Sequence, residues 1–226
     1  MAELAPTTAT YVPNYTGLAP VALLEADPPW AFGDKLSGKG RGAEKNYRVL
    51  PTDQICSYPL PPIATNAILL LWRVGAMQEE ALQVCRAWGF RPTTDLVWVK
   101  TRPCTLHWPQ EDKLPASDDF RMHHCHGCTR NWLGEQKLHF GMGRTLRNCQ
   151  ESAIVGVRGS AGAVIRNRSL RSVVFAPYLG HSRKPEEASD LMEALTPGPY
   201  CRLFSRRHRP NWYCFGDELP PQPEQP

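Results

Sequence analysis

Near its start the chain carries the stretch Val21-Ala22-Leu23-Leu24-Glu25-Ala26-Asp27-Pro28-Pro29-Trp30, which decides the interpretation of the whole fold. The apolar run up to residue 26 is typical of a strand, and the two prolines that follow cannot continue a hydrogen-bond ladder. The stretch therefore predicts a strand over about 21–26 that runs into a proline turn directly after Asp27.

The tetrapeptide Asp27-Pro28-Pro29-Trp30 suits a flat ring that bears an amino group. In a base such as adenine the amine lone pair is delocalised into the ring, so an enzyme that alkylates it must hold both N–H groups and the ring plane. Asp27 and the Pro28 carbonyl can accept the two hydrogens, and Trp30 can stack on the ring. All four residues are therefore predicted to be catalytic. The structural alternative is a turn with Trp30 as core filler, which the 22 prolines of the chain make more plausible.

The 226 residues fit one domain of ordinary size, with 42% hydrophobic and 21% charged residues. No apolar run approaches the roughly 18 residues of a membrane span. No charged segment followed by an apolar segment opens the chain, so we expect a cytoplasmic protein whose eight cysteines are reduced thiols or metal ligands.

The net charge of +4 permits an anionic partner without requiring one. The arginines gather in two groups, Arg202, Arg206, Arg207 and Arg209 in one and Arg166, Arg168 and Arg171 in the other. Each group is open to two interpretations, contact with phosphates or a solvated basic face.

Strand and helix patterns alternate along the chain and predict a doubly wound α/β sandwich. Strands are expected at 21–26, 67–72, 94–100, 152–157, 172–175, 200–205 and 212–215, and helices at 52–57, 78–88 and 185–195. The strand–helix–strand unit from 67 to 100 favours parallel pairing there. Residues 1–17 are expected to form a flexible arm, 18–219 the domain and 220–226 a disordered tail. The polar loop 33–45 is expected to be a mobile lid.

Seven pieces of the chain form a larger pattern, namely Asp27-Pro28-Pro29-Trp30, 43–47, 69–72, 96–100, Gly141-Met142-Gly143 with Arg147-Asn148 and Glu151, 181–187 and 203–219. In type and order they resemble the MT-A70-type adenine N6-methyltransferases over most of the chain. The resemblance implies a Rossmann-like methyltransferase fold in permuted motif order, with S-adenosylmethionine as cofactor.

The resemblance also assigns site residues. Lys184 would meet the carboxylate of the methionine moiety, and Asp27, Phe204, Arg206, His208, Asp217 and Glu218 complete the cofactor set. Asp217 and Glu218 depart from a familiar form of the family that has amides there. Carboxylates accept from ribose hydroxyls but cannot donate to a ring nitrogen, which puts these two contacts in doubt. On the substrate side the predicted residues are Trp30, Asn46, Tyr47, Arg144, Arg147 and Asn148.

The implied reaction is direct transfer of a methyl group to adenine N6, without a covalent enzyme intermediate or a metal. A carboxylate with a reference pKa near 4 is too weak a base to remove an amine proton beforehand. Asp27 would instead draw the amine toward a tetrahedral geometry and stabilise the charge that appears on nitrogen.

An irregular insertion at about 102–140 matches nothing else in the pattern. It contains Cys104-x-x-His107 and Cys125-x-x-Cys128, which have the form of a structural zinc site. The alternative is that these side chains are ordinary packing residues.

Three functions remain open at this point. We expect methylation of adenine N6 in DNA; the alternatives are the same methylation in RNA and a catalytically inactive partner subunit that binds nucleic acid. The sequence leaves the oligomeric state open, with a dimer among the options.

Overall fold

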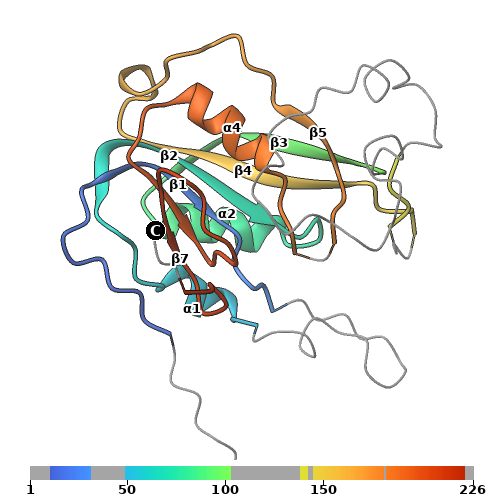
Figure 1. Cartoon of the computed structure of the whole chain (residues 1–226), viewed down its shortest axis with the longest axis horizontal. Helices are drawn as coiled ribbons and strands as arrows, with labels where there is room; N and C mark the ends of the chain where they lie inside the picture. Colours follow the sequence, from blue (N-terminus) through green and yellow to red (C-terminus); the bar gives the residue numbers. More distant parts are fainter. Residues whose placement is uncertain (1–10, 32–48, 103–137, 142–144, 181, 222–226) are drawn as a thin grey trace, which may run out of the picture.

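The computed structural model describes residues 11–31, 49–102, 138–141, 145–180 and 182–221. Within these ranges seven strands form one sheet in the order β5-β3-β4-β2-β1-β6-β7, and helices lie against both of its faces (Figure 1). This mixed α/β single domain agrees with the Rossmann-like methyltransferase fold that the sequence predicts.

The strands are β1 (Val21–Ala26), β2 (Ile63–Arg73), β3 (Arg91–Thr101), β4 (Gln150–Arg158), β5 (Val173–Pro177), β6 (Tyr200–Leu203) and β7 (Trp212–Phe215). The helical elements are α1 (Thr52–Cys56), α2 (Gln78–Ala87), the 3-10 turn η3 (Ala161–Ala163) and α4 (Glu186–Leu195). Every predicted strand and helix is present. β2 and β3 are longer than predicted, because their ladders continue beyond the apolar residues that revealed them.

The predicted parallel pairing between β2 and β3 is wrong. The two strands point the same way, but β4 lies between them and runs antiparallel to both. Leu70 of β2 faces Val155, and Leu96 of β3 faces Ala153. A hydrophobic pattern identifies a strand but does not show which strands pair with it. A strand from later in the chain, here β4, can therefore lie between two earlier ones.

The sheet contributes side chains to two hydrophobic cores, one on each face, because successive strand residues point to opposite faces. In β2, Leu69 and Leu71 join the cluster packed with α1 and α2, whereas Ile68, Leu70 and Trp72 join the cluster packed with α4. Figure 1 shows α4 on one side of the sheet and α1 with α2 on the other. Burial on both faces explains why residues 67–72 of β2 are continuously apolar.

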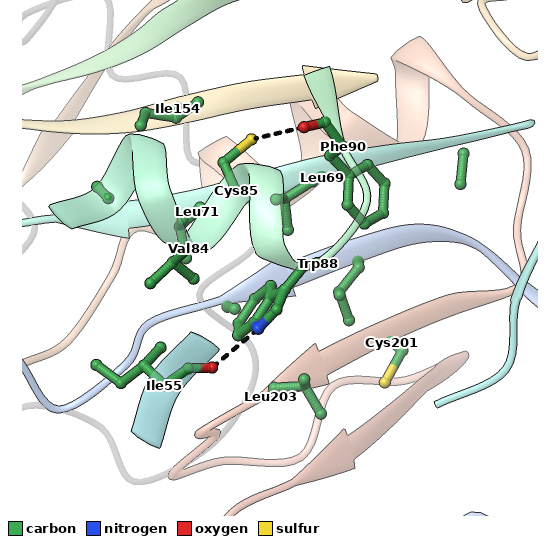
Figure 2. Close-up of a cluster of buried hydrophobic side chains, with 14 of the residues drawn as sticks. Ile55, Leu69, Leu71, Val84, Cys85, Trp88, Phe90, Ile154, Cys201 and Leu203 are labelled. Carbon is green, nitrogen blue, oxygen red and sulfur yellow. Dashed lines mark hydrogen bonds between the residues drawn. The ribbon is translucent and has the colours of Figure 1, made fainter. Parts of the chain in front are cut away.

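Two polar groups in the core beside α1 and α2 form hydrogen bonds (Figure 2). The Trp88 indole N–H donates to the Ile55 carbonyl at 2.9 Å, which joins α2 to α1. Burial raises the pKa of the Cys85 thiol to about 11, so this cysteine is an inert core residue. All five described cysteines are free thiols.

Six of the seven described strands run in one direction, with β4 as the exception, so six carboxyl ends share one edge of the sheet. β1 lies where the chain order changes direction, with β2 on one side and β6 on the other. In open α/β sheets such a point leaves a crevice that binds ligands. Of the helices described, none has the length and apolar character needed to cross a membrane.

Part of the predicted N-terminal arm lies against the domain. The Tyr15 hydroxyl donates to the Pro59 carbonyl at 2.9 Å, and its ring meets the edge of Phe215 with centroids 4.8 Å apart. Residues 1–10 of the arm, 222–226 of the tail, the lid predicted within 33–45 and most of the insertion lie outside the described residues.

Candidate active site

A cavity of about 300 Å³ opens at the carboxyl edge of the sheet. Asp27 follows β1, Lys100 lies near the end of β3, and Glu151 stands at the start of the antiparallel β4, so all three reach the same edge. The volume falls within the range of small-molecule sites. The crevice expected from the strand order is therefore a cavity lined by residues at or just beyond the strand ends.

Most of the predicted residues that the structure describes line this cavity. They are Asp27, Pro28, Pro29, Trp30, Lys184, Phe204, Arg206, Asp217 and Glu218. Tertiary structure thus brings together residues from both ends of the chain, as the resemblance implied.

Three other predicted residues lie outside the cavity lining. The His208 ring nitrogen Nε2 lies 2.7 Å from the Pro220 carbonyl. Arg147 and Asn148 are exposed, and Asn148 Oδ1 accepts from the backbone N–H of Gln150. Asn46, Tyr47 and Arg144 belong to segments outside the described residues.

Lys184 joins two carboxylates at the centre of the cavity. Its Nζ lies 3.0 Å from Asp27 Oδ1 and also forms an ion pair with Glu151. Glu151 in turn bonds Lys100 at 2.9 Å. The four charges cancel, which lowers the cost of holding them in a partly dry site.

These contacts shift the ionisation of the group. Burial raises the pKa of Asp27, and the charge of Glu151 adds to the rise while Lys184 opposes it. Burial also disfavours the charged form of Glu151, but the adjacent Lys184 and Lys100 hold its pKa below the usual value. Lys184 keeps its proton because both carboxylates raise its pKa against the effect of burial. Asp27 is thus the better proton acceptor of the two acids.

Trp30 is largely a core residue in this conformation. Only 4% of it is exposed, and its indole N–H donates to the Trp72 carbonyl at 3.0 Å. It nevertheless contributes to the cavity lining. Its structural place is therefore established, whereas stacking on a base stays a prediction that needs more of the ring to be uncovered.

A buried polar network lies behind Asp27. Glu25, 1% exposed, accepts hydrogen bonds from the Trp72 indole at 3.0 Å, the Ser189 hydroxyl at 2.9 Å and Arg202 Nε at 3.2 Å. These donors come from β2, α4 and β6. One carboxylate thereby fixes the three elements that surround the end of β1.

The arginine group at 202–209 is mostly internal. Glu186, in the first turn of α4, bonds Arg202 at 3.5 Å, Arg207 at 2.8 Å and Arg209 at 2.6 Å. Arg209 also reaches Glu193 at 2.8 Å. Both interpretations of this group, phosphate contact and a solvated basic face, are wrong for these three arginines, because they tie the segment after β6 to α4.

That segment carries several of the predicted cofactor residues. Phe204 has a positive φ of 56° and packs on Tyr58 with ring centroids 4.5 Å apart. Arg206 pairs with Glu218 at 3.2 Å. Gly216 comes so close to the Ser205 backbone that a Cβ there would lie 2.1 Å from its carbonyl oxygen. Only glycine permits this approach, which brings Asp217 and Glu218 beside Arg206.

Several cavity residues received no role in the site from the sequence, namely Arg73, Lys100, Glu151, Tyr178 and Arg183. Lys100 and Glu151 lie within the segments that resemble the family, but in the sequence a single charged residue cannot be told from an ordinary surface residue. The pairing of Trp98 with Glu151 across β3 and β4 brings them into the site. Strand register was the missing information.

The proposed zinc ligands Cys104, His107, Cys125 and Cys128 lie outside the described residues. Among the residues that are described, no group of three or more His, Cys, Asp or Glu side chains is arranged to hold a metal.

A sequence profile of the MT-A70 family matches residues 22–114 and 128–218, which is most of the chain. The chain belongs to the MT-A70 family. This confirms the resemblance drawn from the seven pieces. MT-A70 proteins are adenine N6-methyltransferases that use S-adenosylmethionine.

Named relatives agree with this assignment. This MT-A70 chain is 26% identical over 210 residues to the Drosophila melanogaster protein named N(6)-adenosine-methyltransferase MT-A70-like protein, covering 91% of the chain and 28% of that protein. Human METTL3, an N(6)-adenosine-methyltransferase catalytic subunit, is 27% identical over 206 residues, covering 89% and 29%. Human METTL4, an N(6)-adenine-specific methyltransferase, is 23% identical over 199 residues, covering 85% and 36%. The chain thus spans about a third of the length of these relatives.

The MT-A70 cavity fits S-adenosylmethionine in its chemistry. Lys184 is a cation that suits its carboxylate, Arg206, Asp217 and Glu218 can bond ribose hydroxyls, and Phe204 offers an aromatic face. All five residues line one cavity.

Proposed function

We propose that this MT-A70 chain methylates the N6 amine of adenine in a polynucleotide, with S-adenosylmethionine as methyl donor. The observation that carries the proposal is the position of Asp27, which is held by Lys184 in a cavity that the predicted cofactor residues also line. The activity of the whole protein enters only here, because the chain covers about a third of its named relatives.

Asp27 would accept a hydrogen bond from the adenine amine, as would the Pro28 carbonyl. The Pro28 carbonyl already accepts from the Trp30 backbone N–H at 2.9 Å, which sets its direction and leaves its second lone pair for the base. Two acceptors draw the amine out of conjugation and aim its lone pair. The raised pKa of Asp27 favours uptake of the proton that leaves afterwards.

The bound cofactor would supply an electrophilic methyl group on a sulfonium. Lys184 has three N–H donors and uses two on Asp27 and Glu151, so one remains for the carboxylate of the methionine moiety. Arg206, Asp217 and Glu218 would meet the ribose side. Asp217 and Glu218 stand where a familiar form of the family has amides. As carboxylates they would recognise the cofactor by accepting hydrogen bonds and not by donating them.

DNA is the polymer that we propose, as the sequence analysis expects. RNA is the second candidate, because the names of the Drosophila melanogaster and METTL3 relatives specify adenosine, whereas that of METTL4 specifies adenine. In either polymer a paired adenine must first leave its helix, at a cost of about a few kcal/mol that an unpaired target avoids.

An inactive partner subunit is the less supported alternative. Asp27 and Lys184 are both present and face each other, whereas an inactive chain has no need of that ion pair. We also propose a permuted motif order, because the tetrapeptide 27–30 precedes the predicted cofactor segments. We further propose that the insertion binds zinc through Cys104, His107, Cys125 and Cys128.

The test is to incubate the purified chain with methyl-labelled S-adenosylmethionine and unmethylated DNA or RNA of matched sequence, and to analyse the digested nucleosides. Labelled N6-methyladenine in DNA, lost in Asp27→Ala while cofactor affinity stays within a few-fold, would support the enzyme and its polymer. Label only in RNA would reverse the polymer. Full activity in Asp27→Ala would reject the mechanism, and loss of cofactor binding in the unmodified chain would favour the inactive subunit.

A further inference from the structure

The cavity wall near the ends of β3 and β5 carries aromatic rings. The Tyr178 side chain lines the cavity, and the His139 ring lies 4.1 Å from it between centroids, with the planes tilted by 33°. Trp98, which is buried, lies 6.5 Å from the same tyrosine at 25°. Tyr178 therefore connects the His139 ring to the cavity.

Phe140 follows His139 in the chain and does not line the cavity. Its side chain is 61% exposed, and the Arg147 guanidinium lies 4.8 Å from the centre of its ring. The His139 backbone N–H donates to the Lys100 carbonyl at 2.9 Å, which fixes this segment to the end of β3. We call Tyr178, His139 and Phe140 the aromatic shelf.

Cations border the aromatic shelf. Lys100 Nζ lies 5.3 Å from the Tyr178 ring, and its own partner Glu151 is neutralised by ion pairs. Among the ion pairs of the described residues, none involves Arg147 or Arg102. An aromatic surface beside cations matches the chemistry of a nucleotide, which offers a flat base and an anionic phosphate.

We propose that the aromatic shelf binds a nucleotide adjacent to the target adenine in an unpaired polynucleotide, with its base stacked on the rings and its phosphate at Arg147. The inference rests on the proposed function, because it requires the target base to occupy the cavity. A base within a duplex stacks on its neighbours and presents no free face, so the shelf selects single strands or locally unpaired sites. Stacking on an aromatic side chain contributes about 5- to 100-fold in affinity per base.

A protein partner is the alternative occupant, because exposed aromatic residues and arginines also occur at protein interfaces. The contact between His139 and Tyr178, which lines the cavity, favours a substrate whose target base occupies that cavity.

The experiment uses a single-stranded oligonucleotide of about seven bases with one adenine and a fluorescent 2-aminopurine directly before or after it. Stacking on an aromatic side chain quenches this fluorophore. We expect quenching with the unmodified protein, and Phe140→Ala or Arg147→Ala should weaken binding about tenfold and reduce the quenching. Tyr178→Phe should bind like the unmodified protein, whereas Tyr178→Ala should not.

Matched controls lie elsewhere on the sheet. Phe175 on β5 is 48% exposed and does not line the cavity, and Arg158 ends β4 away from Glu151. Phe175→Ala and Arg158→Ala should leave oligonucleotide affinity within twofold. The variants at Phe140, Arg147, Phe175 and Arg158 should keep their affinity for S-adenosylmethionine, which shows that the fold and the cofactor site are intact.

The outcomes separate the two proposals. Methyl transfer with unchanged affinity and quenching in Phe140→Ala and Arg147→Ala would overturn the shelf and keep the enzyme. Quenching that depends on the shelf, without methyl transfer to any polymer, would overturn the proposed function alone. Equal affinity for a fully paired duplex would overturn the selection of unpaired strands. A change in oligomeric state of Phe140→Ala without a change in oligonucleotide affinity would assign the surface to protein association.

Discussion

Glu25 and Arg202 lie 177 residues apart in the sequence and form a buried ion pair, with Arg202 Nε 3.2 Å from Glu25 Oε2. Arg202 also donates to the Ser189 hydroxyl at 2.5 Å, and Ser189 donates to Glu25, so the three groups close a ring of hydrogen bonds. Glu25 lies two residues before Asp27, and Ser189 lies one turn into α4 after Lys184. The ring therefore couples the two elements next to the Asp27–Lys184 ion pair.

Removing one partner of this pair should be far more damaging than removing both. Glu25→Leu leaves the Arg202 guanidinium buried beside a weaker partner, and we expect a loss of about 3–5 kcal/mol in the free energy of unfolding. Glu25→Leu combined with Arg202→Met removes both charges and should lose less than the sum of the single variants. Urea denaturation measures all three, and strictly additive losses would show that the pair is not coupled.

Trp30 should contribute mainly to stability, because it is 4% exposed and bonded to the Trp72 carbonyl. Trp30→Phe removes that hydrogen bond and should cost about 1–3 kcal/mol, whereas Trp30→Ala leaves a cavity and should cost about 3–5 kcal/mol. If the indole also stacks on the target base, Trp30→Phe should raise the KM for polynucleotide while the KM for cofactor stays the same. An unchanged polynucleotide KM in folded Trp30→Phe would restrict the residue to the core.

Methyl transfer should fall at low pH with an apparent pKa above the ordinary aspartate value. The reaction needs ionised Asp27, and burial together with Glu151 raises its pKa, so activity is lost as the pH falls through that raised value. Glu151→Gln removes a negative charge and should move the acid limb of the kcat/KM profile to lower pH. A shift toward higher pH in this variant would contradict the assignment of the limb to Asp27.

Glu186 should make the fold sensitive to acid. Burial opposes its ionisation, but three arginines lower its pKa from 4.5 to about 2. A carboxyl whose pKa is depressed in the folded state stabilises the protein above its unfolded pKa, and this contribution, at most about 3 kcal/mol, disappears as the pH falls from 4.5 toward 2. Glu186→Gln should be less stable at pH 7 and lose less stability over that acidic range. Equal pH dependence of unfolding in both proteins would contradict this role.

The sequence alone determined which segments are strands and helices, since apolar periodicity reports the burial of one or both faces of an element. The sequence also shows that the tetrapeptide 27–30 precedes Lys184 and Asp217-Glu218. This order of motifs was enough to identify the family. These features are local, because each depends on residues within one turn or one strand.

Tertiary structure alone decided which charges meet. The insertion of β4 between β2 and β3 brings Glu151 into the cavity beside Lys184, and Arg202, Arg207 and Arg209 face α4 where the sequence suggested phosphate contacts or a solvated surface. Trp30, expected to face a base, is largely core. The physical reason is common to all three: local pattern fixes which face of an element is apolar, but the partner of a polar group depends on strand order and register, which are set by contacts between distant parts of the chain.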